Sequence, residues 1–139
     1  MKIQSADKND RKAVWFWIQD PMNQFFINNK NIPDYSQHCV WFDAMCKKEN
    51  IIIGLKDNLR IGLGILLKEQ TTLIAKFYLK PAYCGVIGLE FVSGACEFLY
   101  QKKGEPIHVD CLSNEKIKQD PLESGFSKID ENFLQYSRK

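Results

Sequence analysis

The sequence predicts one α/β (α+β) domain in which helices flank a sheet, and three observations support this prediction. Stretches with strand-type and helix-type patterns follow one another in the order β-α-α-β-β-β-α-β-α-β. The chain has 139 residues, enough for one core, and no linker rich in proline, glycine and serine divides it. Its hydrophobic content of 45% and charged content of 26% are those of an ordinary folded protein. We therefore expect a single domain over residues 1–139.

The N-terminal part of the chain reads as a short strand followed by two helices. Lys2 to Gln4 forms the expected strand, and Asp7 to Gln19 has an apolar side at helical spacing. Asp20-Pro21 ends this helix, because the residue before a proline avoids helical dihedral angles. Asp34, followed three residues later by Gln37, has the pattern of a capping box and predicts the start of the second helix.

The central part of the chain reads as three consecutive strands. Ile51 to Leu55 and Arg60 to Leu67 predict a hairpin that turns at the polar residues Lys56 to Asn58. Thr71 to Leu79 is rich in β-branched and aromatic residues and predicts the third strand.

The C-terminal part begins with a long helix, Val86 to Gln101, which Gly104 ends. We then expect a strand from Ile107 to Leu112, a short helix or turn from Asn114 to Leu122, and one last strand from Ser127 to Tyr136.

Composition and charge argue against several classes of protein. A net charge of +2 is too small to indicate a nucleic-acid or membrane-surface partner. No apolar stretch reaches the roughly 20 residues of a membrane helix, and the polar N-terminus does not resemble a signal peptide, so we expect a cytoplasmic protein. The cysteines are odd in number, with no CxxC pair, which argues against a disulfide framework or metal site and favours core packing. These cysteines are Cys39, Cys46, Cys84, Cys96 and Cys111.

Residues 17–25 read WIQDPMNQF, and Gln37-His38 and Trp41-Phe42 follow. Together with the element order, this stretch resembles the GNAT superfamily of N-acetyltransferases over essentially the whole chain. The motifs are similar to those of one branch, which acetylates the 4-amino group of UDP-linked dideoxy aminosugars on the pathway to pseudaminic acid. Members of that branch read W-R-N-x-P, then N-x-F or N-Q-F, then E-E-H-x-x-W-F. Asn23-Gln24-Phe25 and His38 with Trp41-Phe42 match, whereas Ile18-Gln19 replaces the Arg-Asn pair.

The resemblance implies a mixed, mostly antiparallel central sheet flanked by helices, with acetyl-CoA as co-substrate. In the family, the turn R/Q-x-x-G-x-G/A before the long helix binds the pyrophosphate of CoA through its backbone N–H groups. The matching residues are Cys84, Gly85, Val86, Ile87 and Gly88. Here Cys84 replaces the basic residue and the glycine register is shifted. A strand-to-helix connection with no ligand is the alternative interpretation.

The resemblance also assigns further roles in binding and catalysis. The thioester carbonyl is held in the family by a backbone N–H of the strand that corresponds to Phe77-Tyr78-Leu79, and the cofactor site includes an Asn that matches Asn114. Gly125-Phe126, about a dozen residues later, also matches the family pattern. The proton source of the family is a tyrosine whose matching position is Pro121, so this role is vacant.

Three side chains remain candidates for proton transfer. Tyr78 and Tyr83 are candidate proton donors to the thiolate, and the alternative for each is a half-buried aromatic at the end of a strand. His38 is the candidate to contact or deprotonate the acceptor, because the ordinary pKa of histidine lies near neutrality. Its alternative is a structural histidine hydrogen-bonded to a loop.

The acceptor is expected to bind near Asn23, Gln24, Phe25 and Trp41. Phe25-Phe26 with Trp41-Phe42 offers a candidate stacking surface for a nucleotide base, and the alternative is that these rings pack the helices against the sheet.

The leading hypothesis is an acetyl-CoA-dependent N-acetyltransferase that acts on a small-molecule amine, with a nucleotide-linked aminosugar for surface glycans among the candidates. A catalytically degenerate domain of the same fold, which binds a ligand or partner, is the alternative, and Pro121 and Cys84 favour it. A second copy of the chain, in a homodimer, is a further expected partner.

Overall fold

The computed structural model describes residues 1–19, 34–79, 86–110, 126–128 and 133–136. Its strands form one mixed sheet in the order β1-β2-β3-β4-β5-β7-β6. Neighbouring strands are antiparallel except for β4 and β5, which are parallel. The elements are β1 (Lys2–Ser5), the 3-10 helix η1 (Lys8–Asp10), α1 (Arg11–Gln19), α3 (Tyr35–Lys47), β2 (Ile51–Lys56), β3 (Leu59–Glu69), β4 (Thr72–Leu79), α4 (Val86–Lys103), β5 (Ile107–Asp110), β6 (Phe126–Lys128) and β7 (Phe133–Tyr136).

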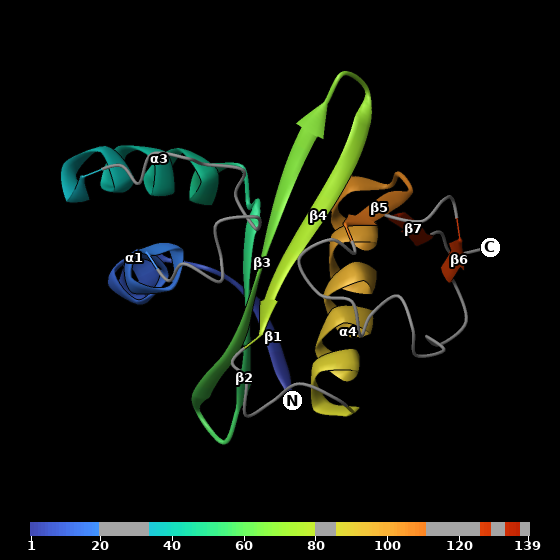
Figure 1. Cartoon of the computed structure of the whole chain (residues 1–139), viewed down its shortest axis with the longest axis horizontal. Helices are drawn as coiled ribbons and strands as arrows, with labels where there is room; N and C mark the ends of the chain where they lie inside the picture. Colours follow the sequence, from blue (N-terminus) through green and yellow to red (C-terminus); the bar gives the residue numbers. More distant parts are fainter. Residues whose placement is uncertain (20–33, 80–85, 111–125, 129–132, 137–139) are drawn as a thin grey trace.

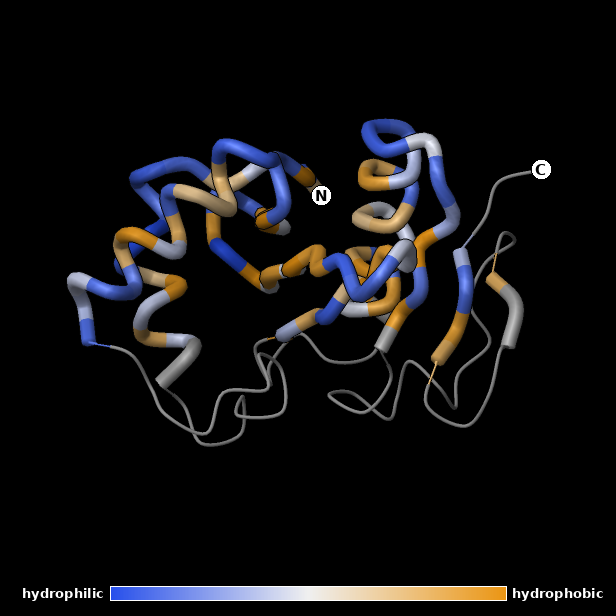
Figure 2. Tube along the Cα trace, turned by 90° about the horizontal axis from the view of Figure 1, so that it is seen from above, coloured by the Kyte–Doolittle hydropathy of each residue, from blue (hydrophilic) through white to orange (hydrophobic). Residues whose placement is uncertain are grey.

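Helices cover both faces of the sheet. Figure 1 shows α1 and α3 on one side of the strands and α4 on the other. Ile51, Ile52 and Ile53 are all fully buried, although successive side chains of a strand point to opposite faces. A strand that is apolar on both faces needs cover on both, and α1 with α3 and α4 provide it. In Figure 2 the hydrophobic residues of the strands accordingly lie between the two helical layers.

Local sequence signals explain several boundaries. Asp34 accepts a hydrogen bond from the backbone N–H of Gln37 at 2.8 Å, and the Gln37 side chain accepts one from the N–H of Asp34 at 3.1 Å. The predicted capping box is therefore confirmed. Asp57 and Asn58 both have positive φ, 52° and 65°, as a tight hairpin turn between β2 and β3 requires. Gly104 has a φ of 69° at the end of α4.

The last predicted strand is wrong in one respect. The run Ser127 to Tyr136 contains two short antiparallel strands, β6 and β7, which pair with each other. β7 lies between β5 and β6 in the sheet, and residues 129–132 lie outside the described ranges. The other predicted strands and helices that fall in the described ranges are confirmed with small shifts of their ends, whereas Asn114 to Leu122 lies outside these ranges.

The described residues contain no helix with the length and apolar character that a membrane crossing requires. Within the same ranges, no group of three or more His, Cys, Asp or Glu side chains is arranged to hold a metal ion. Cys96 is a fully buried free thiol in α4, as expected for a core residue, and Cys39 and Cys46 are half-buried free thiols in α3.

Candidate functional site

The pairing between the two parallel strands at the centre of the sheet ends before β4 does. β4 pairs with β5 from Leu73 to Ala75, and Ala75 lies opposite Val109. β4 nevertheless continues to Leu79, which is still in register with Gly62 of β3. In the described part of the chain, the register between β4 and β5 thus ends four residues before β4 does, and β5 is described only as far as Asp110. We call the β5 side of Phe77 to Leu79, where no described strand pairs with β4, the splay.

The hydrogen-bond pattern shows which backbone groups face this splay. The N–H of Leu66 in β3 donates to the carbonyl of Asn50 at 2.8 Å, so the backbone groups of Leu66 point toward β2. Ala75, directly opposite Leu66, therefore has its backbone groups on the other side, toward β5. This direction repeats at every second residue of a strand, so the N–H and C=O groups of Phe77 and Leu79 also point toward β5. No described strand pairs with these two residues on that side.

The start of α4 is the second feature of the site. α4 has 18 residues and no acidic side chain in its first turn, where Gly88 is buried and Ile87 is half-buried. The ring of Phe91, in the next turn, packs edge-on against the ring of Phe77, with 5.8 Å between the ring centroids. The N-terminus of α4 therefore lies on the same part of β4 as the splay. A helix N-terminus favours an anion through its unpaired N–H groups and its dipole.

The opposite face of β4 presents Tyr78 and Lys76 toward α1 and α3. The half-buried Tyr78 ring lies 5.4 Å, between centroids, from the ring of Trp17 in the last turns of α1. Lys76 is only 3% exposed, which makes it one of the few buried charged residues among the described ones. This lysine was not among the residues that the sequence pattern indicated. The signal was present, because Lys76 is the single charge in the apolar run Leu73 to Leu79.

His38 does not lie at this site, which corrects its predicted role in contacting or deprotonating an acceptor. Its side chain is fully buried between α3 and α1, and its Nε2–H donates to the backbone carbonyl of Arg11 at 3.0 Å. Burial lowers the pKa of the imidazole below its ordinary value, and the Arg11 guanidinium lowers it too, against the opposing effects of that hydrogen bond and of Asp43. A buried neutral histidine has no surface for an acceptor, so His38 joins two helices instead.

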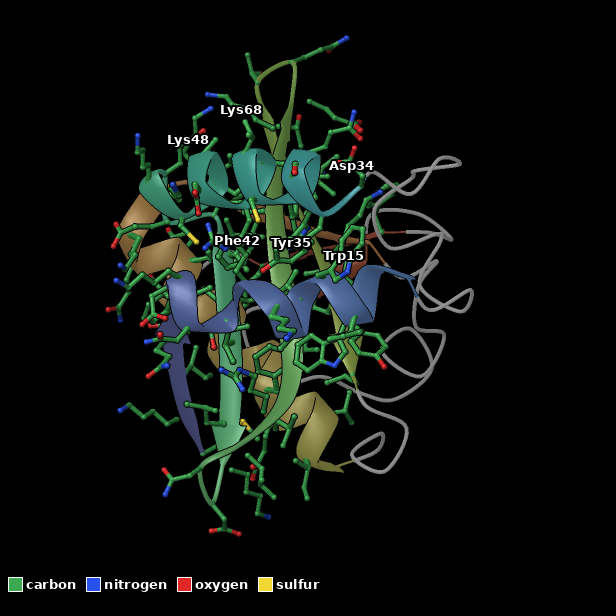
Figure 3. All side chains as sticks on the ribbon, turned by 90° about the vertical axis from the view of Figure 1, so that its left-hand side faces the viewer. Trp15, Asp34, Tyr35, Phe42, Lys48 and Lys68 are labelled. Atoms are coloured by element: carbon green, nitrogen blue, oxygen red, sulfur yellow. The ribbon has the colours of Figure 1, made fainter. Side chains whose placement is uncertain are left out.

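Aromatic rings surround His38 and fix the two helices relative to each other. Rings of both helices lie within 6.2 Å of the imidazole, centroid to centroid, and these are Trp15, Tyr35, Trp41 and Phe42. Figure 3 shows Trp15 of α1 and Tyr35 of α3 at the same end of the helix pair, where their rings meet edge-on at 5.6 Å. Arg11, at the start of α1, binds both carboxylate oxygens of Asp43 at 3.1 Å, so α1 and α3 are antiparallel.

The same packing removes Phe42 from the predicted stacking surface. Phe42 is fully buried in the core and offers no face to a nucleotide base. Trp41 is half-buried and packs against the core. The remaining predicted residues lie outside the described ranges, and these are Asn23, Gln24, Phe25, Phe26, Tyr83, Cys84, Gly85 and Asn114.

The sequence-predicted residues that the structure does bring together come from β4 and α4. Phe77 and Leu79 present backbone N–H groups to the splay, Tyr78 faces the other side of the same strand, and Val86 to Gly88 form the first turn of α4. This arrangement can bind an extended ligand along β4 through backbone hydrogen bonds, with an anionic end at the helix.

No protein-family model matches the chain, and no curated protein is significantly similar to it. Solved structures do share its fold. An N-acetyltransferase from Staphylococcus aureus Mu50 has 14% identity and a TM-score of 0.66 over 96% of this chain and 93% of its own. A ribosomal-protein-alanine N-acetyltransferase from Brucella melitensis has 12% identity and a TM-score of 0.70 over 98% and 97%. A spermidine N-acetyltransferase from Vibrio cholerae, in complex with CoA and spermine, has 7% identity and a TM-score of 0.68 over 96% and 91%.

Similarity at these identities concerns the fold. It covers nearly the full length of each chain, including the mixed sheet and the helices on its two faces. The chain therefore has the fold of the GNAT N-acetyltransferases, as its sequence predicts.

Proposed function

We propose that this chain is an N-acetyltransferase that transfers the acetyl group of acetyl-CoA to an amine. One observation carries the proposal: β4 outlasts its pairing with β5, so the backbone N–H groups of Phe77 and Leu79 face the splay beside the N-terminus of α4. Acetyl-CoA has a long arm with amide and thioester carbonyls and a pyrophosphate at its other end. The splay and the helix terminus match these two parts in order.

The residues present can supply most of the required chemistry. The amine nitrogen forms a bond to the thioester carbon, the C–S bond breaks, the nitrogen releases a proton and the sulfur takes one up. A backbone N–H of Phe77 or Leu79 stabilises the charge that develops on the carbonyl oxygen. Tyr78, on the same strand, and Tyr83 are the proposed proton donors to the sulfur.

The proposed acetyl-CoA site combines the splay with the turn before α4. Backbone groups of Val86, Ile87 and Gly88 would bind the pyrophosphate at the helix N-terminus. Cys84, Gly85 and Asn114 complete the proposed site by their place in the sequence.

The proposed acceptor is a small-molecule amine, and the 4-amino group of a nucleotide-linked aminosugar is the finer proposal. Asn23, Gln24, Phe25 and Trp41 would contact it, and the resemblance of residues 17–25 to the aminosugar branch supports this choice. The solved structures of this fold have other acceptors, such as the spermine of the Vibrio cholerae enzyme.

A second candidate function is a catalytically degenerate binding domain. Two observations favour it: Pro121 occupies the position of the family's tyrosine, and His38, the sequence's candidate base, is buried in a helix interface. Such a domain would bind CoA, a nucleotide sugar or a partner without releasing thiol.

The first test is thermal unfolding of the purified chain with and without acetyl-CoA. A ligand at about 100 times its dissociation constant stabilises a protein by roughly 2.7 kcal/mol, which raises the midpoint by several degrees in a domain of this size. 3′-Phosphoadenosine 5′-diphosphate serves as the control, because it keeps the pyrophosphate but lacks the arm that the splay would bind. No shift with millimolar acetyl-CoA would refute the proposal, whereas a shift without release of free thiol in the presence of amines would favour the degenerate domain.

A further inference from the structure

The ring of Phe91 lies directly on the backbone of two strands. Gly54 of β2 and Gly62 of β3 face each other in the sheet, on the side that α4 covers. A Cβ atom at Gly54 would lie 2.5 Å from Cδ1 of Phe91, and one at Gly62 would lie 2.8 Å from Cε2. Both distances are far below a normal contact. The two glycines thus form a flat depression that the fully buried ring fills.

The same ring also contacts the strand at the splay. Phe91 packs edge-on against Phe77 at 5.8 Å, with an interplanar angle of 88°. Phe77 is itself seated on a glycine, because a Cβ at Gly64 would lie 2.8 Å from its Cε1 atom. Phe91 therefore contacts β2, β3 and β4 at once, and through Phe77 it contacts the residue whose backbone faces the splay.

This position links the two halves of the proposed acetyl-CoA site. The first turn of α4 precedes Phe91 directly in the helix, and Phe77 contributes one of the splay N–H groups. A single ligand that spans both halves binds well only if their separation is fixed. If one half is displaced, the ligand cannot contact both halves at once. Rings that pack closely against the backbone of glycine residues have little freedom to slide, since any shift would cause a steric clash.

We propose that Phe91 is a positioning residue that sets the distance between the anion-binding end of α4 and the backbone of β4. This inference rests on the proposed function, because it assumes that CoA bridges the two. The alternative is that Phe91 stabilises the core in the same way as any buried aromatic side chain. The two accounts differ in whether CoA affinity depends on this particular ring or only on the stability of the fold.

Phe91→Leu and Leu99→Ala form a matched pair for the test. Both side chains are fully buried in α4, and both substitutions remove the same number of side-chain carbon atoms. Leu99 lies in the C-terminal half of the helix, away from its first turn. The dissociation constant for CoA is measured by titration calorimetry, and the urea midpoint of each variant is measured alongside. We expect Phe91→Leu to weaken CoA binding about tenfold relative to Leu99→Ala. Equal affinity in the two folded variants would overturn the inference.

A compensating variant tests the same contact from the side of β2, with the urea midpoint measured beside CoA affinity. Gly54→Ala places a methyl group where the Phe91 ring lies, and Leu at position 91 frees part of that volume. We expect the double variant Gly54→Ala/Phe91→Leu to bind CoA more tightly than either single variant. Independent, additive losses in the double variant would overturn the inference.

The experiments distinguish a failure of the proposed function from a failure of this inference. If the wild-type chain binds neither CoA nor acetyl-CoA, the proposed function is refuted and the positioning role falls with it. If the wild type binds and the matched variants bind equally, only the role of Phe91 is refuted.

Discussion

Replacing Leu79 with proline would remove one backbone donor from the splay while leaving the sheet ladder intact. The backbone groups of Leu79 point away from β3, so a proline at this last position of β4 breaks no bond between β3 and β4. Tyr78 is extended, which is the conformation that a residue before proline prefers. Leu79→Ala is the matched control, because it also removes the buried leucine side chain but keeps the N–H group.

The expected magnitude follows from the loss of one hydrogen bond. Truncating a buried leucine costs about 2–5 kcal/mol of stability, a loss that Leu79→Ala shares. A single hydrogen bond contributes about 0.5–1.5 kcal/mol net, which corresponds to about a 2- to 12-fold change in affinity. We therefore expect Leu79→Pro to bind acetyl-CoA about 2- to 12-fold more weakly than Leu79→Ala.

Titration calorimetry on the folded variants measures this difference directly, and circular dichroism at the same temperature confirms that both are folded. If wild type binds acetyl-CoA and the two variants bind it equally, the Leu79 N–H makes no contact with the ligand. The reasoning that the Leu79 N–H binds the arm of CoA would then be refuted, which would leave the N–H of Phe77 as the donor that the proposed function requires.

Two further predictions concern groups whose pKa is shifted by burial. The pKa of His38 is held below its ordinary value of 6.5, so the unfolded chain takes up a proton at a higher pH than the folded chain does. The contribution of neutral His38 to the free energy of unfolding is complete above about pH 6.5. It is lost as the pH falls, at up to about 1.4 kcal/mol per pH unit. The urea midpoint of His38→Phe should therefore fall less between pH 7.5 and pH 5.5 than that of the wild type. An unchanged slope would contradict this assignment. Burial raises the pKa of the Cys46 thiol to about 11 and raises that of Cys96 further, so both should resist iodoacetamide at pH 8 until the chain unfolds, as peptide mass mapping would show.

Most of the fold could be predicted because its signals are local. The capping pair Asp34 and Gln37, the hairpin turn at Asp57-Asn58 and the apolar runs of β2 to β4 each determine their own structure with little help from distant residues. The division of Ser127 to Tyr136 into two strands was missed because it depends on a distant partner. β7 pairs with the edge of β5, and the sequence of residues 127–136 does not indicate this pairing.

The candidate site was less predictable, for two physical reasons. A motif match places His38 in the sequence but says nothing of its burial, which arises where α1 packs against α3. The splay depends on where the register between β4 and β5 ends, and that is a property of two segments whose paired residues lie 34 positions apart in the sequence. Only the charge of Lys76 inside an apolar strand gave a local sign that β4 is unusual.

A candidate site made of backbone groups does not depend on particular side chains. Backbone N–H groups of Phe77 and Leu79 and the end of α4 are present whatever side chains occupy those positions. Chains with 7–14% identity share this fold, although no family model matches this one. If the proposed function holds, replacement of a basic residue by Cys84 removes a side-chain charge from the anion site but no backbone N–H group. The identity of the acceptor must instead depend on side chains, and Tyr78 and Lys76 are two described side chains on the opposite face of β4. Substitutions at these two positions should alter acceptor choice before they alter CoA affinity.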